Sequence, residues 1–244
     1  MPVTEYLERN ARLYPDEVAL VEVNPDEPDT RRTSWKEFEL IQPSRFEPYR
    51  REITWSVFDE KANRFANMLI GRGIKKGDKV AILMYNCLEF CVSFLALLKL
   101  GAVTIPLPSK YKKQEVSSLV EKADVSCIIC DQDFYKWFED FETQGIRRIA
   151  CSDIEKGYGL ATYHSPETES PVCHDSFDDA IIMFTSGTTS QSKGVVIKNY
   201  NIMNAVATYQ KILNITADDI SAIPIPIYHV TGMVALLGLF IHPS

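Results

Sequence analysis

The chain has 244 residues, of which 45% are hydrophobic and 24% are charged, and its formal net charge is −7. This balance excludes a disordered or fibrous protein, because enough apolar surface is present to offset the chain entropy lost on folding. The acidic charge and the lack of clustered Lys and Arg exclude nucleic acid as a leading partner.

The number of cysteines and the length of the apolar runs indicate the cellular compartment of the protein. The six cysteines are too dilute for the disulfide framework of a small secreted domain, which indicates a reducing environment. The longest apolar run, 233–241, is shorter than the roughly 20 residues of a membrane-spanning helix, and 1–10 lacks a stretch of signal-peptide length. We therefore expect a cytoplasmic protein without a transmembrane segment, whose oligomeric state the sequence leaves open.

The first elements precede a segment of unusual composition. Apolar spacing predicts a helix over 3–13, and alternation predicts a short strand over 19–23. From residue 24 the chain is rich in Arg, Asp and Glu and contains several prolines, which prevent a long regular element. We predict that 24–52 is an irregular surface insertion.

Residues 56–151 alternate between helix-like and strand-like patterns. The strand-like runs are continuously apolar, as expected for strands that are covered on both faces. Alternation of strands with crossover helices is typical of an α/β fold with a doubly wound, mostly parallel sheet. The predicted helices are 56–70, 88–100, 114–122 and 134–141, and the predicted strands are 79–84, 102–107, 125–130 and 147–151.

A second irregular stretch, 157–175, leads into the last section of the chain. We predict that residues 1–175 form a first α/β subdomain and that 176–244 begin a second one. The later pattern predicts strands 180–184, 195–198 and 220–225, a helix 202–213 with Asn199 as its N-cap, and a helix that begins near Thr231.

The loop between the first two of these strands carries an anion-binding set of residues. It holds six hydroxyl side chains, two glycines and a lysine directly after a buried strand. Glycine lets backbone N–H groups approach phosphate oxygens, hydroxyl groups donate to them, and lysine supplies a positive charge. A polyphosphate is the expected ligand. The residues are Thr185, Ser186, Gly187, Thr188, Thr189, Ser190, Ser192, Lys193 and Gly194.

This loop differs from the Walker A loop of P-loop proteins. That loop requires a glycine directly before the lysine, a Ser or Thr directly after it, and then a helix. Here Ser192 precedes Lys193, Gly194 follows it, and the next element is a predicted strand. On composition alone, a Ser/Thr-rich turn between two strands explains the loop equally well.

The segment 184–197 strongly resembles the signature loop of the adenylate-forming, or AMP-binding, superfamily, which includes acyl-CoA synthetases, peptide-synthetase adenylation domains and firefly luciferase. Ser190 stands where the family usually has glycine and Ser192 where it usually has proline, so hydroxyl groups are kept near the phosphates. The resemblance implies that Lys193 is catalytic and holds the β- and γ-phosphates of ATP, which Mg²⁺ bridges. The other implied ATP-binding residues are Thr185, Ser186, Gly187, Thr188, Thr189 and Ser190.

A second segment, 224–232, resembles the family's Pro-rich, His-containing segment at the mouth of the acyl pocket. The resemblance implies that Tyr228, His229 and Thr231 line the substrate site. His229 would stand beside the carboxylate and the CoA tunnel as a positional or gating residue, and not as a general base. Capping or packing also explains a histidine that precedes an apolar helix.

Cys127 and Cys130 have the spacing of a metal-binding motif. They lie in a predicted strand, where side chains three residues apart point to opposite faces, and no second Cys/His pair follows at ligand spacing. We predict two buried structural cysteines and no metal site.

The resemblance implies a two-step reaction. A carboxylic acid, with a fatty acid as the first candidate, attacks the α-phosphate of ATP, and CoA then attacks the acyl-adenylate. The first step would depend on positioning and charge neutralisation. The family's adenine and ribose segments and its C-terminal domain are not found in the sequence, so we expect an N-terminal part that is inactive alone. An enzyme that loads an amino or hydroxy acid onto a carrier protein, and a nucleotide-binding module without catalysis, are the alternatives.

Overall fold

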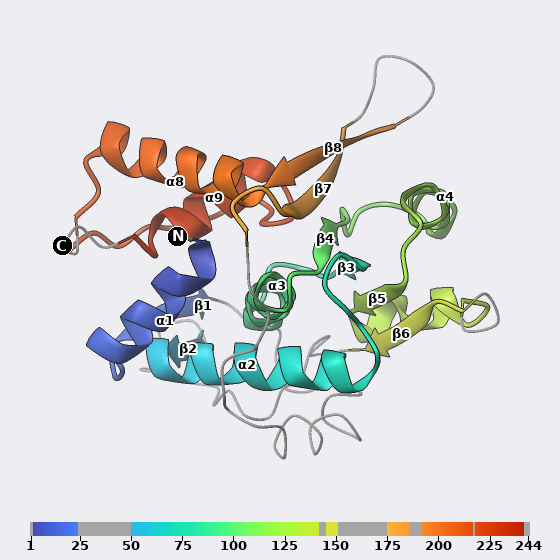
Figure 1. The fold of residues 1–244 in the computed structure, drawn as a ribbon, viewed down its shortest axis with the longest axis horizontal. Helices are drawn as coiled ribbons and strands as arrows, with labels where there is room; N and C mark the ends of the chain where they lie inside the picture. The colour runs from blue at the N-terminus through green and yellow to red at the C-terminus, as the bar shows by residue number, and fades with distance from the viewer. Residues whose placement is uncertain are drawn as a thin grey trace.

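The computed structural model describes residues 2–23, 50–141, 145–150, 175–185, 192–216 and 218–241. In these ranges the chain forms a two-stranded ribbon, a six-stranded sheet and helices on both faces of that sheet (Figure 1). The predicted α/β class is confirmed. The predicted irregular stretches at 24–49 and 157–174 lie outside the described residues.

The N-terminal region combines helix α1 (Val3–Leu13) with strands β1 (Val18–Val23) and β2 (Arg50–Thr54), which pair antiparallel. Helix α1 matches its predicted range. The prediction of an irregular surface segment is wrong for 50–52, which lie in β2, and Arg51 is only 1% exposed. Composition alone suggested exposure, whereas hydrogen bonding to β1 makes these residues a strand.

Helices α2 (Trp55–Gly71) and α3 (Leu88–Leu100) pack against each other. Helix α2 begins directly after β2, because the Thr54 hydroxyl accepts a hydrogen bond from the Val57 N–H at 3.4 Å and caps the helix. Helix α3 matches its predicted range, and every one of its residues is buried, as expected for a helix that is almost entirely apolar. Gly101, in the left-handed conformation, ends it.

The main sheet has the strand order β6-β5-β3-β4-β7-β8. All neighbouring strands from β6 to β7 pair in parallel, and β8 pairs antiparallel with β7. The predicted mostly parallel sheet is therefore confirmed. The strands are β3 (Lys79–Leu83), β4 (Val103–Pro106), β5 (Cys127–Cys130), β6 (Arg147–Ala150), β7 (Asp179–Thr185) and β8 (Lys193–Lys198).

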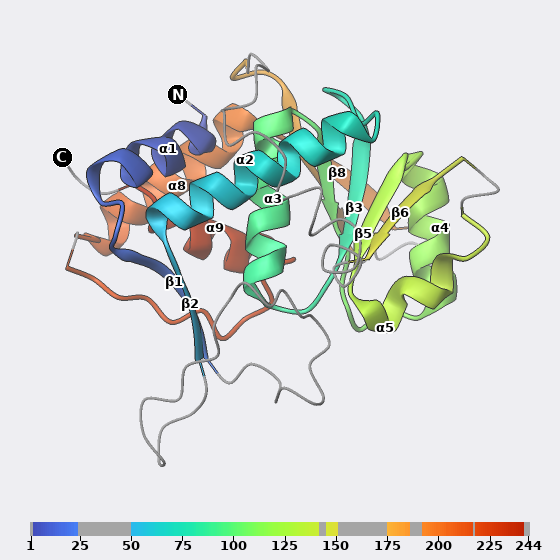
Figure 2. The same cartoon turned by 90° about the horizontal axis from the view of Figure 1, so that it is seen from below.

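The two faces of the sheet carry different helices, as Figure 2 shows, with α1 to α3 on one side and α4 and α5 on the other. The second group comprises α4 (Lys113–Ala123), α5 (Gln132–Tyr135) and the 3₁₀ helix η1 (Lys136–Phe138). The predicted single helix 134–141 is wrong, since α5 starts earlier and passes into η1. Aromatic rings of this segment pack against one another, so side-chain contacts and not helical periodicity set its geometry.

Cys127 and Cys130 in β5 illustrate the doubly wound arrangement. Cys127 belongs to the apolar cluster that contains α2 and α3, whereas Cys130 belongs to the cluster that contains α4 and the aromatic segment. Both thiols are buried, and neither belongs to a disulfide in the described part of the chain. The opposite orientation predicted from strand periodicity is confirmed.

Helices α8 (Asn199–Leu213) and α9 (Val230–Gly238) pack against each other after the sheet. The prediction of Asn199 as the N-cap is wrong, because Asn199 is the first helical residue. Lys198 takes the cap position, and its N–H donates a hydrogen bond to Asn201 Oδ1 at 3.0 Å. The side chain that satisfies the helix start therefore comes from within the first turn.

The predicted strand 220–225 is wrong, because 218–229 contains no regular element and Ile220 is fully exposed. Pro224 and Pro226 lack the N–H groups that strand pairing requires. Strand β7 hydrogen bonds to β4, so one sheet continues across the predicted subdomain boundary near residue 175. That boundary stays a prediction.

Candidate functional site

The predicted phosphate loop connects the two strands of the β7–β8 hairpin. Thr185 ends β7, Lys193 begins β8, and the two residues are paired across the hairpin. The Thr185 hydroxyl donates a hydrogen bond to the Lys193 carbonyl at 3.4 Å. The predicted start of the strand at 195 is wrong by two residues, because pairing with β7 extends it. Ser186, Gly187, Thr188, Thr189 and Ser190 lie outside the described residues.

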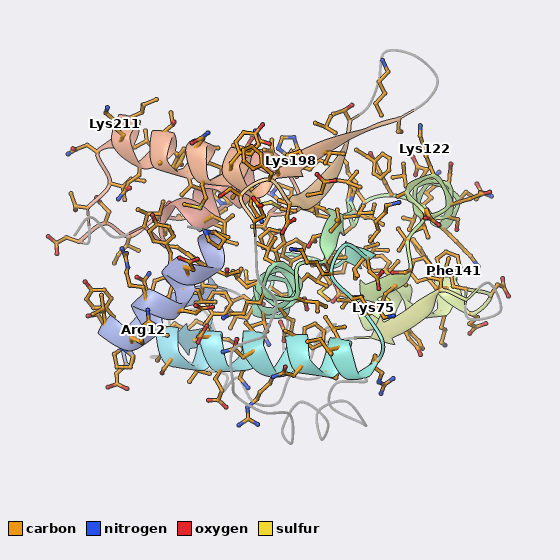
Figure 3. All side chains as sticks on the ribbon, viewed as in Figure 1. Arg12, Lys75, Lys122, Phe141, Lys198 and Lys211 are labelled. Carbon is orange, nitrogen blue, oxygen red and sulfur yellow. The ribbon has the colours of Figure 1, made fainter. Side chains whose placement is uncertain are left out.

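Lys193 and Lys198 stand at opposite ends of β8 in different surroundings. Thr185 and Lys193 are exposed, and the described residues provide no ion pair for the Lys193 ammonium. Lys198, shown in Figure 3 where β8 meets α8, forms an ion pair with Asp179 at 2.6 Å. The hydrogen bond to Asp179 raises the pKa of Lys198. Lys193 is thus the terminal lysine of β8 that is available to an anionic ligand.

A residue of helix α4 contacts the loop end of the same hairpin. Lys122, labelled on α4 in Figure 3, donates a hydrogen bond through its ammonium to the carbonyl of Ser192, which directly precedes Lys193. The contact places a second cation beside the start of β8. Lys122 was not predicted from the sequence, since nothing in its helical position distinguishes it from other surface lysines.

The second predicted site lies at the start of α9. His229 is exposed and caps the helix, because its Nδ1 accepts a hydrogen bond from the Thr231 N–H at 3.4 Å. Thr231 is exposed, and Tyr228 is half-buried against the cluster that contains α2 and α3. The capping that the sequence left as an alternative is therefore present. A role of these three residues in a substrate pocket stays a prediction.

Gly232 permits the tight approach of α9 to the turn before it. A Cβ atom at this position would lie 2.4 Å from the Pro226 carbonyl oxygen, which is closer than non-bonded atoms approach. The same carbonyl accepts a hydrogen bond from the His229 N–H at 3.1 Å. The turn that presents His229 therefore depends on a glycine that the sequence analysis did not single out.

The two predicted sites lie at the same edge of the sheet. Asn86, three residues after β3, hydrogen bonds to the backbone of Ile225 and Ile227. Strands β3, β4 and β7 run parallel to one another, so Thr185 at the end of β7 lies at the same edge of the sheet as the residues that follow β3. Ligands of open α/β sheets bind at this carboxyl edge. A polar residue directly after a buried strand was the signal that could have identified Asn86.

Charged groups around α3 are structural. Arg51 forms hydrogen bonds with both carboxylate oxygens of Glu89, at 2.6 and 2.8 Å, and also pairs with Glu22. Burial raises the pKa of Glu22, although the Arg51 charge opposes this shift. Lys99 pairs with carboxylates of α1 and α2 at 2.7 and 3.0 Å. Burial also raises the pKa of Cys91, so its thiol stays protonated and is no nucleophile.

The described residues also lack two features that would indicate other kinds of site. None of their helices is long and apolar enough to cross a membrane. Among the same residues, no group of three or more His, Cys, Asp or Glu side chains is arranged to hold a metal ion.

Solved structures share this fold. The N-terminal domain of FACL13 from Mycobacterium tuberculosis superposes with a TM-score of 0.79 at 24% identity, over 98% of this chain and 55% of that chain. The long-chain-fatty-acid-CoA ligase FadD1 from Archaeoglobus fulgidus gives a TM-score of 0.80 at 16% identity, over 98% of this chain and 45% of that one. At these identities the likeness shows the fold.

Sequence comparison finds relatives among CoA ligases. The crotonobetaine/carnitine–CoA ligase of Escherichia fergusonii is 30% identical over 185 residues, which are 70% of this chain and 35% of that protein. The enzyme of the same description from Salmonella paratyphi B is 28% identical over 74% of this chain and 37% of that protein. The chain therefore spans little more than a third of the length of these relatives. The family described as AMP-binding enzyme matches residues 7–243, so this chain belongs to that family.

Proposed function

We propose that this chain supplies the triphosphate-binding part of an enzyme that uses ATP to convert a carboxylic acid into its acyl-adenylate and then into an acyl-CoA thioester. The observation that carries the proposal is the exposed Lys193 at the loop end of the β7–β8 hairpin, at the carboxyl edge of the sheet of an AMP-binding family member. The curated relatives named above are CoA ligases, which supports this reaction class.

Lys193 would act as the cation for the transferring phosphates. Its ammonium would neutralise charge on the β- and γ-phosphates. The Thr185 hydroxyl, turned away from the Lys193 carbonyl, would donate to the same group together with the loop residues that follow it. Bound Mg²⁺ would neutralise further phosphate charge. In such sites Mg²⁺ takes phosphate oxygens and water molecules as most of its ligands.

Tyr228, His229 and Thr231 would line the site of the carboxylic acid. Because the Thr231 N–H occupies His229 Nδ1, the imidazole would meet the substrate through its other ring nitrogen. A fatty acid is the first candidate substrate, and CoA is the proposed acceptor. Comparison of free CoA with a phosphopantetheinylated carrier protein, in an enzyme that contains this chain, separates the proposal from carrier loading.

Triphosphate binding by the chain tests the role of Lys193. Inorganic triphosphate is the probe, because its binding does not require an adenine or ribose site. We expect Lys193→Ala to weaken binding about 10- to 100-fold in calorimetric titration, since a charge-assisted hydrogen bond is lost. Lys198→Ala removes the lysine at the other end of β8 and is expected to leave affinity unchanged. Equal affinity of the Lys193 variant and the wild type would refute the proposal.

A pyrophosphate-exchange assay addresses the chain alone. We propose that adenylation also requires parts found in the other two thirds of its relatives, so the 244 residues should show negligible exchange with any acid. Robust exchange by the isolated chain would contradict this.

A further inference from the structure

The segment that carries Tyr228, His229 and Thr231 contains no regular element before α9, yet its backbone is held at two points by one side chain. The Asn86 Nδ2 donates a hydrogen bond to the Ile225 carbonyl at 2.9 Å. The Asn86 Oδ1 accepts a hydrogen bond from the Ile227 N–H at 3.0 Å. A single amide thus satisfies a carbonyl and an N–H two residues apart, as a neighbouring β-strand would do.

Asn86 is itself attached to the buried centre of the fold. It lies between β3 and the fully buried α3. The N–H of Tyr85, the preceding residue, donates to Asp131 Oδ2 at 2.9 Å, and Asp131 is buried at the carboxyl end of β5. Asn86 therefore links the sheet, through its hydrogen bonds, to a segment that is 139 residues away in sequence.

The far end of the anchored segment is equally constrained. Ile227 is buried in the cluster that contains α2 and α3. The Pro226 carbonyl accepts the His229 N–H and stands where Gly232 has no side chain. With Ile225 and Ile227 held by Asn86, little freedom is left for the backbone that carries His229.

We propose that Asn86 is a positioning residue, whose amide sets the place of the His229 segment relative to the carboxyl edge of the sheet. The effect on catalysis rests on the function proposed above, whereas the effect on the backbone does not. Asn86 acts through the segment and is not itself a catalytic residue.

Asn10 provides a control of the same residue type. Asn86 is exposed, whereas Asn10 is buried. The Asn10 Nδ2 donates a hydrogen bond to the Phe240 carbonyl at 2.9 Å, so it also holds a distant backbone group, but beyond the other end of α9. Asn10→Ala and Asn86→Ala therefore each remove a side-chain amide that hydrogen bonds to backbone in the C-terminal region. Only Asn86→Ala removes such bonds from the His229 segment.

Hydrogen exchange measured by mass spectrometry on the whole chain tests the backbone effect. We expect Asn86→Ala to accelerate exchange about tenfold in peptides that cover 223–232, because the Ile227 N–H loses its acceptor. Asn10→Ala is expected to leave these peptides unchanged. Unchanged exchange in Asn86→Ala, or equal acceleration in both variants, would overturn the proposal.

Asn86→Asp supplies a pH-dependent rescue. A protonated carboxyl group donates to the Ile225 carbonyl and accepts from the Ile227 N–H as the amide does, whereas the carboxylate loses the donor and repels the carbonyl. Protection of 223–232, corrected for intrinsic exchange, should therefore approach the wild-type value near pH 3, about one unit below the ordinary pKa of aspartic acid, and fall by roughly tenfold by pH 7. A variant whose protection shows no such pH dependence would refute the hydrogen-bonding role.

In an enzyme that contains this chain, Asn86→Ala should raise KM for the carboxylic acid about tenfold and leave KM for ATP unchanged. A parallel rise in both constants, or none in either, would overturn the catalytic part of the proposal. Failure of the wild-type enzyme to form any adenylate would instead refute the proposed function, and the exchange results would still decide the role of Asn86 in the backbone.

Discussion

Helix α3 and the β7–β8 hairpin place charged side chains in opposite environments. Glu89 and Lys99 of α3 are 0% and 2% exposed, and both are paired with opposite charges. Lys193 of the hairpin is exposed, and the described residues leave it without an ion pair. A buried charge requires a partner because its desolvation is costly, so the charges of α3 are committed to the fold. The charge on Lys193 is free for a ligand.

The largest expected effect is the loss of stability caused by Arg51→Met, which removes the cation from the buried charges beside α3. This change leaves Glu22 and Glu89 near each other without their cation, and we expect it to lower the free energy of unfolding by about 3–5 kcal/mol. Urea denaturation measures the effect. Arg50→Met is the matched control, since its half-exposed pair with Glu52 should contribute less than about 1 kcal/mol. Similar losses in both variants would show that burial does not distinguish the two arginines.

Gly232→Ala tests how strictly the turn before α9 is built. The added methyl group would overlap the Pro226 carbonyl, so we expect a loss of about 1–3 kcal/mol in unfolding free energy. Gly71→Ala is the control, because no atom lies within 4 Å of its Cβ position at the end of α2. If both alanine variants are as stable as the wild type, the turn before α9 does not require a glycine at position 232.

His229→Ala separates the two roles of this histidine. Loss of the cap on α9 should cost about 1 kcal/mol in thermal or urea unfolding. His229→Asn keeps an N-cap acceptor and should restore most of that stability. If His229 also lines the substrate site, the asparagine variant of an active enzyme should still have a raised KM for the acid. Full recovery of both properties would leave capping as its sole role.

The smallest expected effect is the pH dependence of Glu22→Gln. Burial raises the pKa of Glu22 above 4.5, so the folded protein binds this proton more tightly than the unfolded chain. The contribution of Glu22 is therefore largest below pH 4.5 and falls as pH rises through the raised pKa. The difference in unfolding free energy, wild type minus Glu22→Gln, should decrease from about pH 4 to about pH 8. An increase over this range would show that the pKa of Glu22 is lowered, and not raised, in the folded protein.

Elements with a self-contained pattern were predicted well. Helices α1 and α3 match their predicted ranges, because the spacing of apolar residues and the stop at Gly101 are properties of local sequence. Errors arose where an element depends on a distant partner. Residues 50–52 form a strand by pairing with β1, whereas 220–225 has a strand-like composition but is not a strand.

The candidate site divides in the same way. A motif of hydroxyl groups, glycines and Lys193 could be identified from the sequence because the ligand chemistry is local. Lys122 and Gly232 could not, since each depends on a backbone group far away in the chain or on a close approach that only folding creates. Asn86 could be noticed as a polar residue after a buried strand, but its partners in 225–227 could not be predicted.

By itself, the sequence determined the class of fold, the long helices, the parallel strands and the residue types suited to a phosphate. Only the tertiary structure decided that the hairpin and the His229 segment share one edge of the sheet and that Arg51 is buried with two carboxylates. The physical reason is that periodicity records which face of an element is apolar, whereas polar contacts between distant backbone and side-chain groups leave no periodic trace.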